Sequence, residues 1–175
     1  MKDQQPKRQG RALAEQEYKN ARVNLLLMLI LTVVNIALYL VGADVMMLFS
    51  ATVPYYAAAF AFELGAPLVV PLMSVALISL AAYLLCWIFS KKHYGWMIAA
   101  LVLFVLDSLA LAVLYLSVSD ASGIMDAIIH VWVLWYLIKG VKYGHQLKTL
   151  PPAEELPDEP THLTPPADQQ PPLML

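Results

Sequence analysis

The sequence contains little that could carry the chemistry of a soluble enzyme. Its one cysteine, Cys86, excludes a disulfide, a CxxC redox pair and a cysteine zinc site within these 175 residues. No Gly-rich phosphate loop, Ser-His-Asp arrangement or HExxH sequence occurs. The histidines lack the short spacing of metal ligands, so we expect no metal; they are His93, His130, His145 and His162. We predict a protein that is not an enzyme, with no catalytic residue and no cofactor.

Charged residues are also scarce, and apolar residues take their place. Only 14% of the chain is charged and 60% is hydrophobic, with a mean hydropathy of +0.64. A soluble domain has about 25% charged and about 45–50% apolar residues. A chain of this length forms one folding unit, and one this apolar buries its surface against lipid. We predict an integral membrane protein whose partner is the lipid bilayer, with no nucleic-acid partner.

Four apolar runs are long enough to cross a bilayer as helices, at residues 23–41, 68–89, 96–118 and 123–143. The first has 19 residues, and about 20 helical residues at about 1.5 Å each cross a hydrocarbon core of about 30 Å. The turns at 90–95 and 117–122 are short enough to require antiparallel hairpins. The predicted fold is an all-α membrane protein, an antiparallel bundle of four transmembrane helices.

A fifth apolar segment, residues 46–64, is ambiguous. Pro54 leaves only about 11 helical residues after it, which cover roughly 16 Å, or half of a bilayer. Tyr55 and Tyr56 favour the membrane interface, where a ring can keep its hydroxyl in water. We predict a short interfacial or re-entrant helix on the outer side, with a complete fifth span as the alternative.

The positive charges decide between four and five spans. With four spans, all 11 Lys and Arg residues lie on one side of the membrane. A fifth span would move Lys91 and Lys92 outside, against the rule that positive loops stay in the cytoplasm. We therefore predict four spans with both ends in the cytoplasm. The charged residues on the outer side are all acids: Asp44, Glu63, Asp120 and Asp126.

The two terminal segments are polar in different ways. Residues 1–22 form a basic juxtamembrane segment, which we expect to be partly helical because Arg11, Glu15 and Lys19 recur at intervals of four. Residues 144–175 contain eight of the 12 prolines, and the five acids after residue 149 have no basic partner there. This composition predicts a disordered, Pro-rich acidic tail in the cytoplasm.

Asp107 is the charged residue that stands out, because it lies in the middle of the third span. An ionised carboxylate there costs roughly 2.5–3.5 kcal/mol on insertion scales, so it should face the bundle interior and be protonated or paired. His130 in the fourth span lies at a similar depth, within about one helical turn. One interpretation is a proton or ion relay through this pair, with Asn35, Thr32 or Ser108 as companions. The other is a buried polar contact that holds helices together.

The remaining polar and aromatic side chains favour structural interpretations. Asp126 stands four residues before His130, but in the first turn of its helix a carboxylate interacts with the positive end of the dipole. No GxxxG pattern occurs within any of the four predicted spans, and alanines supply the small side chains for helix contacts. We predict an anchoring belt on the cytoplasmic side, made of Trp87, Tyr94, Trp96, Trp132, Trp135, Tyr136 and Tyr143.

The stretch ARVNLLLMLILTVVNIALYL, followed by FSATVPYY, resembles the start of small multi-pass membrane proteins of Firmicutes-type bacteria. The resemblance covers about the first 60 residues and is carried by Asn24, Asn35, Phe49, Ser50, Pro54 and Tyr55. It implies a bacterial cytoplasmic membrane and a fold of this kind. It implies no activity, because that group has none assigned.

Two functional hypotheses follow. The first is a non-enzymatic accessory or oligomerising membrane subunit, whose partner is a second copy or another membrane protein. The second is a small transporter or proton-coupled permease component that uses Asp107 and His130, with Asn35 as a further member of the intramembrane polar site. With only four spans, such a transporter is expected to dimerise.

Overall fold

The computed structural model describes residues 5–43, 49–118 and 124–150, and these fold into helices without a strand. The five helices are α1 (Gln5–Leu40), α2 (Thr52–Glu63), α3 (Ala66–Phe89), α4 (Gly95–Val118) and α5 (Ile124–Thr149). All but α2 are long and apolar enough to cross a membrane. The predicted class, four membrane-spanning helices with one short additional helix, is confirmed.

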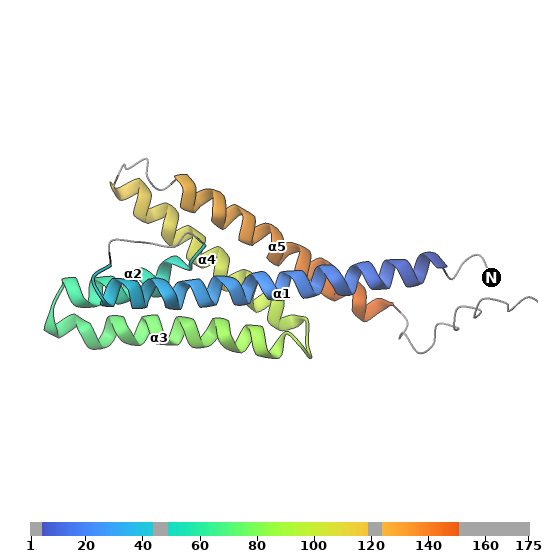
Figure 1. The fold of residues 1–175 in the computed structure, drawn as a ribbon, viewed down its shortest axis with the longest axis horizontal. Coiled ribbons are helices and arrows are strands. Elements are labelled where there is room, and N and C mark those ends of the chain that lie inside the picture. The colour runs from blue at the N-terminus through green and yellow to red at the C-terminus, as the bar shows by residue number, and fades with distance from the viewer. Residues whose placement is uncertain (1–4, 44–48, 119–123, 151–175) are drawn as a thin grey trace, which may run out of the picture.

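Two of the helices extend well beyond the thickness of a bilayer core. α1 has 36 residues, about 54 Å at helical rise, against a core of about 30 Å. It lies against α5, which ends at Thr149, six residues past the predicted end of its span (Figure 1). Residues 144–149, predicted to begin a disordered tail, are therefore helical. They are held because the start of α1 supplies a surface for them, as in the contact of Tyr18 with Gly144. The rest of the predicted tail, 151–175, lies outside the described residues.

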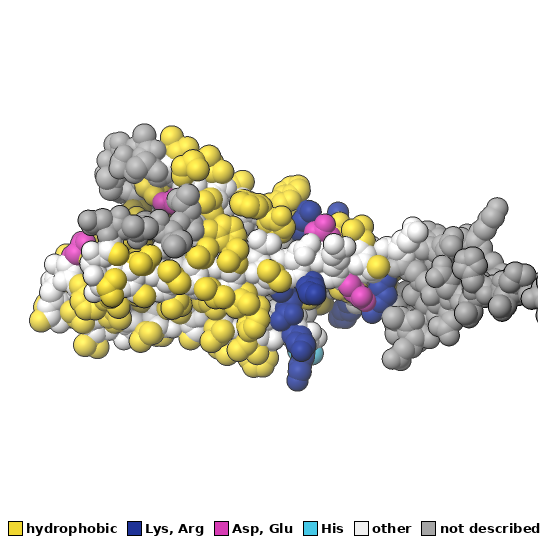
Figure 2. All heavy atoms as spheres, in the orientation of Figure 1, with side chains coloured by type: hydrophobic (Ala, Val, Ile, Leu, Met, Phe, Trp, Pro, Cys, Tyr) yellow, Lys and Arg dark blue, Asp and Glu magenta, His cyan; other side chains and the backbone are white. Residues whose placement is uncertain are grey.

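The described positive charges gather at one end of the bundle, which we call the basic end (Figure 2). There the extension of α1, the turn between α3 and α4, and the last turns of α5 meet. Lys139 on α5 pairs with Glu17 on α1 at 3.3 Å across this junction. Glu63 and Asp126 lie toward the opposite end. The predicted outer acids Asp44 and Asp120 lie outside the described residues.

The short helix α2 begins about halfway along the bundle and runs toward the end opposite the basic end (Figure 1). Its first turn is bonded to Asp107, which stands 12 residues after the start of α4 and 11 before its end. Its last turn is bonded to Tyr39 at the end of α1, through Ala59 and Glu63. α2 is therefore the predicted short helix, and with 12 residues it is too short to cross a bilayer core of about 30 Å as a fifth span.

The apolar core lies between α1, α3, α4 and α5. At the basic end the core is bordered by a cation–π contact, in which the Arg22 guanidinium lies 5.8 Å from the ring centroid of Trp87. Buried polar side chains of Thr32, Thr52, Asp107 and His130 interrupt it at its middle. Its fully buried large side chains are Leu25, Met28, Met97, Phe104, Val133 and Leu137.

Candidate functional site

The side chain of Asp107 on α4 caps the first turn of α2. Its Oδ2 accepts a hydrogen bond of 2.8 Å from the backbone nitrogen of Thr52, and its Oδ1 accepts one of 2.7 Å from that of Val53. The local cap residue, Ala51, supplies no side-chain bond. A carboxylate at a helix N-terminus interacts favourably with the positive end of the dipole and with the free N–H groups. The charge predicted to be costly in mid-membrane therefore has a partner in the backbone of α2.

All four N–H positions at the start of α2 are accounted for. A helix leaves its first four donors without an internal partner. The Ala51 nitrogen donates to Thr32 Oγ1 on α1 at 2.8 Å, and Asp107 accepts the next two. Pro54 has no N–H to satisfy. Two helices, α1 and α4, thus supply the acceptors that let α2 begin inside an apolar bundle, where an unsatisfied donor would cost several kcal/mol.

The imidazole of His130 on α5 completes the arrangement. Its Nδ1 lies 2.9 Å from the carbonyl oxygen of Asp126, which can only accept, so Nδ1 carries a hydrogen. Its Nε2 lies 3.2 Å from Asp107 Oδ2 and 3.1 Å from Thr52 Oγ1. Either Nε2 donates to the carboxylate as part of an imidazolium, or it accepts the Thr52 hydroxyl as part of a neutral ring. The ring stacks on Phe104, with centroids 5.0 Å apart.

We call Thr32, Thr52, Asp107 and His130 the polar cluster. Its members are buried, with Asp107 2% and His130 6% exposed. Among the described residues, no buried side-chain nitrogen or oxygen lacks a hydrogen-bond partner. A buried network that is fully satisfied makes its packing rigid and specific. The cluster therefore fixes the depth and direction of α2 relative to α1, α4 and α5.

The structure brings Asp107 and His130 together and places the other candidates differently. Asn35 is buried on α1, one turn beyond Thr32. Ser108 bonds back to the Phe104 carbonyl of its own helix. Thr32 belongs to the cluster because its Oγ1 accepts the hydrogen bond of the Ala51 nitrogen at the start of α2.

Asp126 is held in the first turn of α5 by a neighbouring helix. Its carboxylate accepts a hydrogen bond of 2.6 Å from the Tyr115 hydroxyl on α4. It reaches His130 through its backbone oxygen only. Asp126 and His130 therefore do not form a pair of side-chain ligands, in keeping with a role for Asp126 at the helix terminus.

A cavity of about 500 Å³ lies between α4 and α5 beside His130. Its lining is mostly apolar, and its polar groups come from Ser108, Tyr115 and His130. It is the place from which a bound molecule could approach the polar cluster. An apolar cavity with a few convergent polar groups is the usual form of a small-molecule site.

Phe49 precedes α2 in an unusual backbone conformation. Its φ of 77° lies in the left-handed region, which is rare for a residue with a side chain. The ring packs edge-on against Trp132, with centroids 5.8 Å apart. Trp132 thus contacts the entrance to α2 in mid-bundle, whereas the sequence suggested a place in the belt at the basic end. This contact helps hold the strained turn that starts the helix.

α1 and α5 pack closely at a glycine pair that the sequence prediction missed. A Cβ on Gly140 would lie 2.7 Å from the Cβ of Ala21, and one on Gly144 would lie 2.7 Å from the Tyr18 ring. The pair forms a GxxxG pattern, which lets helix backbones approach closely. The pattern was not found within the predicted span because that span ended at Tyr143, one residue before Gly144. Following helical spacing past the apolar run would have found it.

The comparisons with known proteins give no further lead. No family model, no curated protein and no solved structure matches the chain. Its function has to be argued from its own residues.

Proposed function

We propose that this chain is a non-enzymatic membrane subunit or accessory protein that acts by association, with a second copy or with another membrane protein. The observation that carries the proposal is the saturation of the polar cluster. Asp107 is engaged by two backbone N–H groups, and His130 by three polar neighbours. Groups bonded in this way stabilise a fixed arrangement of helices.

The surface of α3 supports association. Only 11% of its most apolar window is buried inside the chain, the smallest share among the four long helices. Its exposed face carries the small side chains of Ser74 and Ala81 between larger apolar ones. Small residues allow close approach of a neighbouring helix in a bilayer, where packing drives association.

We further propose a bacterial cytoplasmic membrane, with the basic end of the bundle in the cytoplasm. Its support is the charge distribution, since the described Lys and Arg residues share one end (Figure 2). Positive loops are retained in the cytoplasm during insertion. Labelling of an introduced cysteine at Lys148 only after permeabilisation supports this orientation, and labelling in intact cells contradicts it.

Crosslinking in native membranes tests association. In a Cys86→Ala background, Ala81→Cys places a thiol on the exposed face of α3, and Val102→Cys places one on α4 at a matched depth. A bifunctional maleimide should convert the α3 variant into a discrete larger species and leave the α4 variant monomeric. Only monomer for both variants contradicts association, and equal crosslinking of both contradicts α3 as the surface.

A second function is favoured by one specific observation. Asp107 and His130 lie 3.2 Å apart in mid-bundle, at the start of a half-length helix and beside the cavity between α4 and α5. Helices that begin inside the bilayer and ionisable pairs at that depth are features of transporter sites. The alternative proposal is a small transporter or proton-coupled permease component that works as an oligomer.

A further inference from the structure

We infer that the basic end contains a binding site for the phosphate group of an anionic lipid, independent of any association through α3. The site is a cavity of about 410 Å³ between the turn that joins α3 to α4 and the last turns of α5. Lys91, Lys92 and His93 line it from the turn, and Lys148 lines it from α5. None of the described lining residues is acidic.

The floor of this cavity is built from buried, bonded groups. Ser90 is 1% exposed, and its carbonyl oxygen accepts a hydrogen bond of 2.6 Å from the Tyr18 hydroxyl. Its hydroxyl accepts a bond of 3.0 Å from Arg22 Nε, and the Arg22 guanidinium also reaches the Trp87 carbonyl. This fixes the turn against α1. The positive charge of Arg22 is therefore bonded to Ser90, the residue that precedes Lys91.

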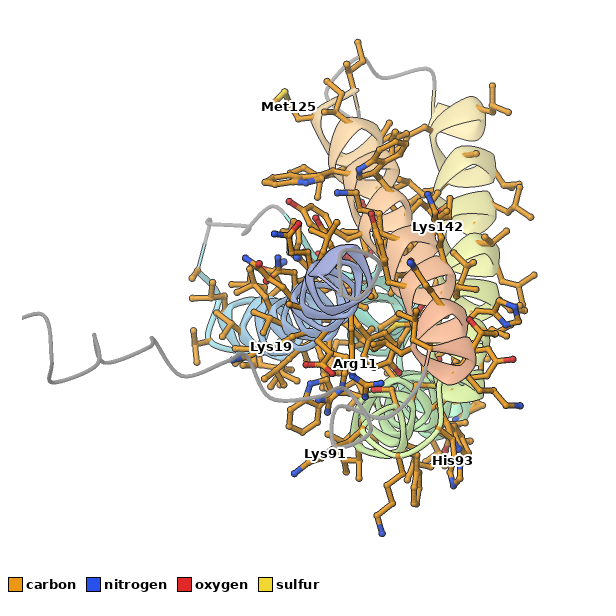
Figure 3. All side chains as sticks on the ribbon, turned by 90° about the vertical axis from the view of Figure 1, so that its right-hand side faces the viewer. Arg11, Lys19, Lys91, His93, Met125 and Lys142 are labelled. Carbon is orange, nitrogen blue, oxygen red and sulfur yellow. The ribbon has the colours of Figure 1, made fainter. Side chains whose placement is uncertain are left out.

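The lysines have few competing partners nearby. Lys148 lies 5.8 Å from the ring centroid of Tyr94, a contact that leaves its N–H groups available. Glu17 on α1 is paired with Lys139. Figure 3 shows the basic end face-on, with Lys91 and His93 on one side and Lys142 on another. A concave surface with several cations and no acid suits a dianionic or monoanionic phosphate.

The position of the cavity favours a lipid as the source of that phosphate. It opens where the apolar part of α3 ends, at Phe89, and where α4 begins, at Gly95. Phe89 and Trp96 stack on each other at 5.0 Å and remain 41% and 37% exposed. Aromatic rings of this kind mark the level of the headgroups. The acyl chains would then extend from the cavity into the apolar core of the membrane, with the headgroup among the lysines.

Thermal unfolding of the full chain in a non-ionic detergent tests the site. The probes are short-chain phosphatidylglycerol, short-chain phosphatidylcholine and inorganic phosphate, each titrated against the wild type. Phosphatidylglycerol should raise the unfolding temperature with saturation, and the other two should not. Each lysine removed should weaken apparent affinity about fivefold, so Lys91→Gln with Lys92→Gln should weaken it about 25-fold.

Lys142→Gln is the matched control, since it removes an exposed lysine of the basic end that does not line the cavity. It should leave the affinity for phosphatidylglycerol unchanged. An equal loss in this variant would overturn the site in favour of diffuse surface charge. Equal stabilisation by phosphatidylcholine, whose headgroup is zwitterionic, would overturn the requirement for a net negative headgroup. Equal stabilisation by inorganic phosphate would overturn the lipid as the source of the phosphate.

Discussion

Asp107 accepts a hydrogen bond of 2.8 Å from the backbone nitrogen of Thr52, which precedes it by 55 residues. The residue that the sequence marks as the most expensive in the membrane is therefore the cap of a helix that starts there. The cost of the buried carboxylate and the cost of the unbonded helix start offset each other. Neither α2 nor a charged Asp107 would be stable at this depth without the other.

Asp107→Asn should destabilise the chain, because the amide offers one acceptor where the carboxylate offers two. One buried N–H of Thr52 or Val53 then faces an NH₂ group, at an expected cost of about 1–3 kcal/mol. The free energy of unfolding in bicelles measures this cost. Ser108→Ala, the adjacent position, removes a hydroxyl that bonds only within its own helix and should change stability little. Equal effects of the two variants would contradict the cap.

Thr32→Val should destabilise the start of α2 by a separate route. Valine keeps the shape of the side chain but removes the oxygen that accepts the Ala51 hydrogen bond. We expect a loss of about 1–3 kcal/mol. Thr32→Ser keeps an acceptor, so it should restore most of that loss in the same assay. A serine variant as unstable as the valine variant would show that packing of the methyl group matters and the hydrogen bond does not.

Asp107 and His130 should be energetically coupled. Because their side chains are in contact, the losses from Asp107→Asn and His130→Gln should fall short of or exceed additivity by about 0.5–3 kcal/mol. His145→Gln provides the comparison, since His145 lies at the basic end beside Tyr94. The cycle of Asp107→Asn with His145→Gln should be additive. Additivity in both cycles would exclude an energetic coupling between Asp107 and His130.

Gly140→Ala should separate α1 from α5. The added Cβ would lie 2.7 Å from that of Ala21, which is fixed to the backbone and cannot turn away. Overpacking of this kind costs about 1–3 kcal/mol. Gly10→Ala, at a helical position with nothing within 4 Å, should instead raise stability by about 0.5–1 kcal/mol. Opposite signs in thermal unfolding are therefore expected, and a neutral Gly140→Ala would contradict the close packing.

The number of membrane helices could be predicted from the sequence because it depends on local properties. The length of each apolar run and the placement of the lysines decide it. The same properties predicted α2 as a half-length helix, since Pro54 stands close to its start. Pro54 is in fact the third residue of α2, where its missing N–H costs nothing.

The partner of Asp107 could not be predicted in the same way. Backbone N–H groups have no residue type, so the donors of Thr52 and Val53 leave no mark in the sequence. Among charged or titratable side chains, the sequence offered only His130 as a partner. The two backbone N–H groups that also bond Asp107 could not be read from it. The predicted start of a helix inside the bilayer was the available signal, because its free N–H groups need acceptors there.

Proton flux in liposomes separates a structural cluster from a proton path most directly. The wild type and Asp107→Asn are reconstituted at equal density, and the decay of an imposed pH gradient is followed with a dye trapped inside. If Asp107 serves to cap α2, both preparations should hold the gradient as well as empty liposomes. Dissipation by the wild type that disappears in Asp107→Asn would contradict this and make the permease proposal the leading one.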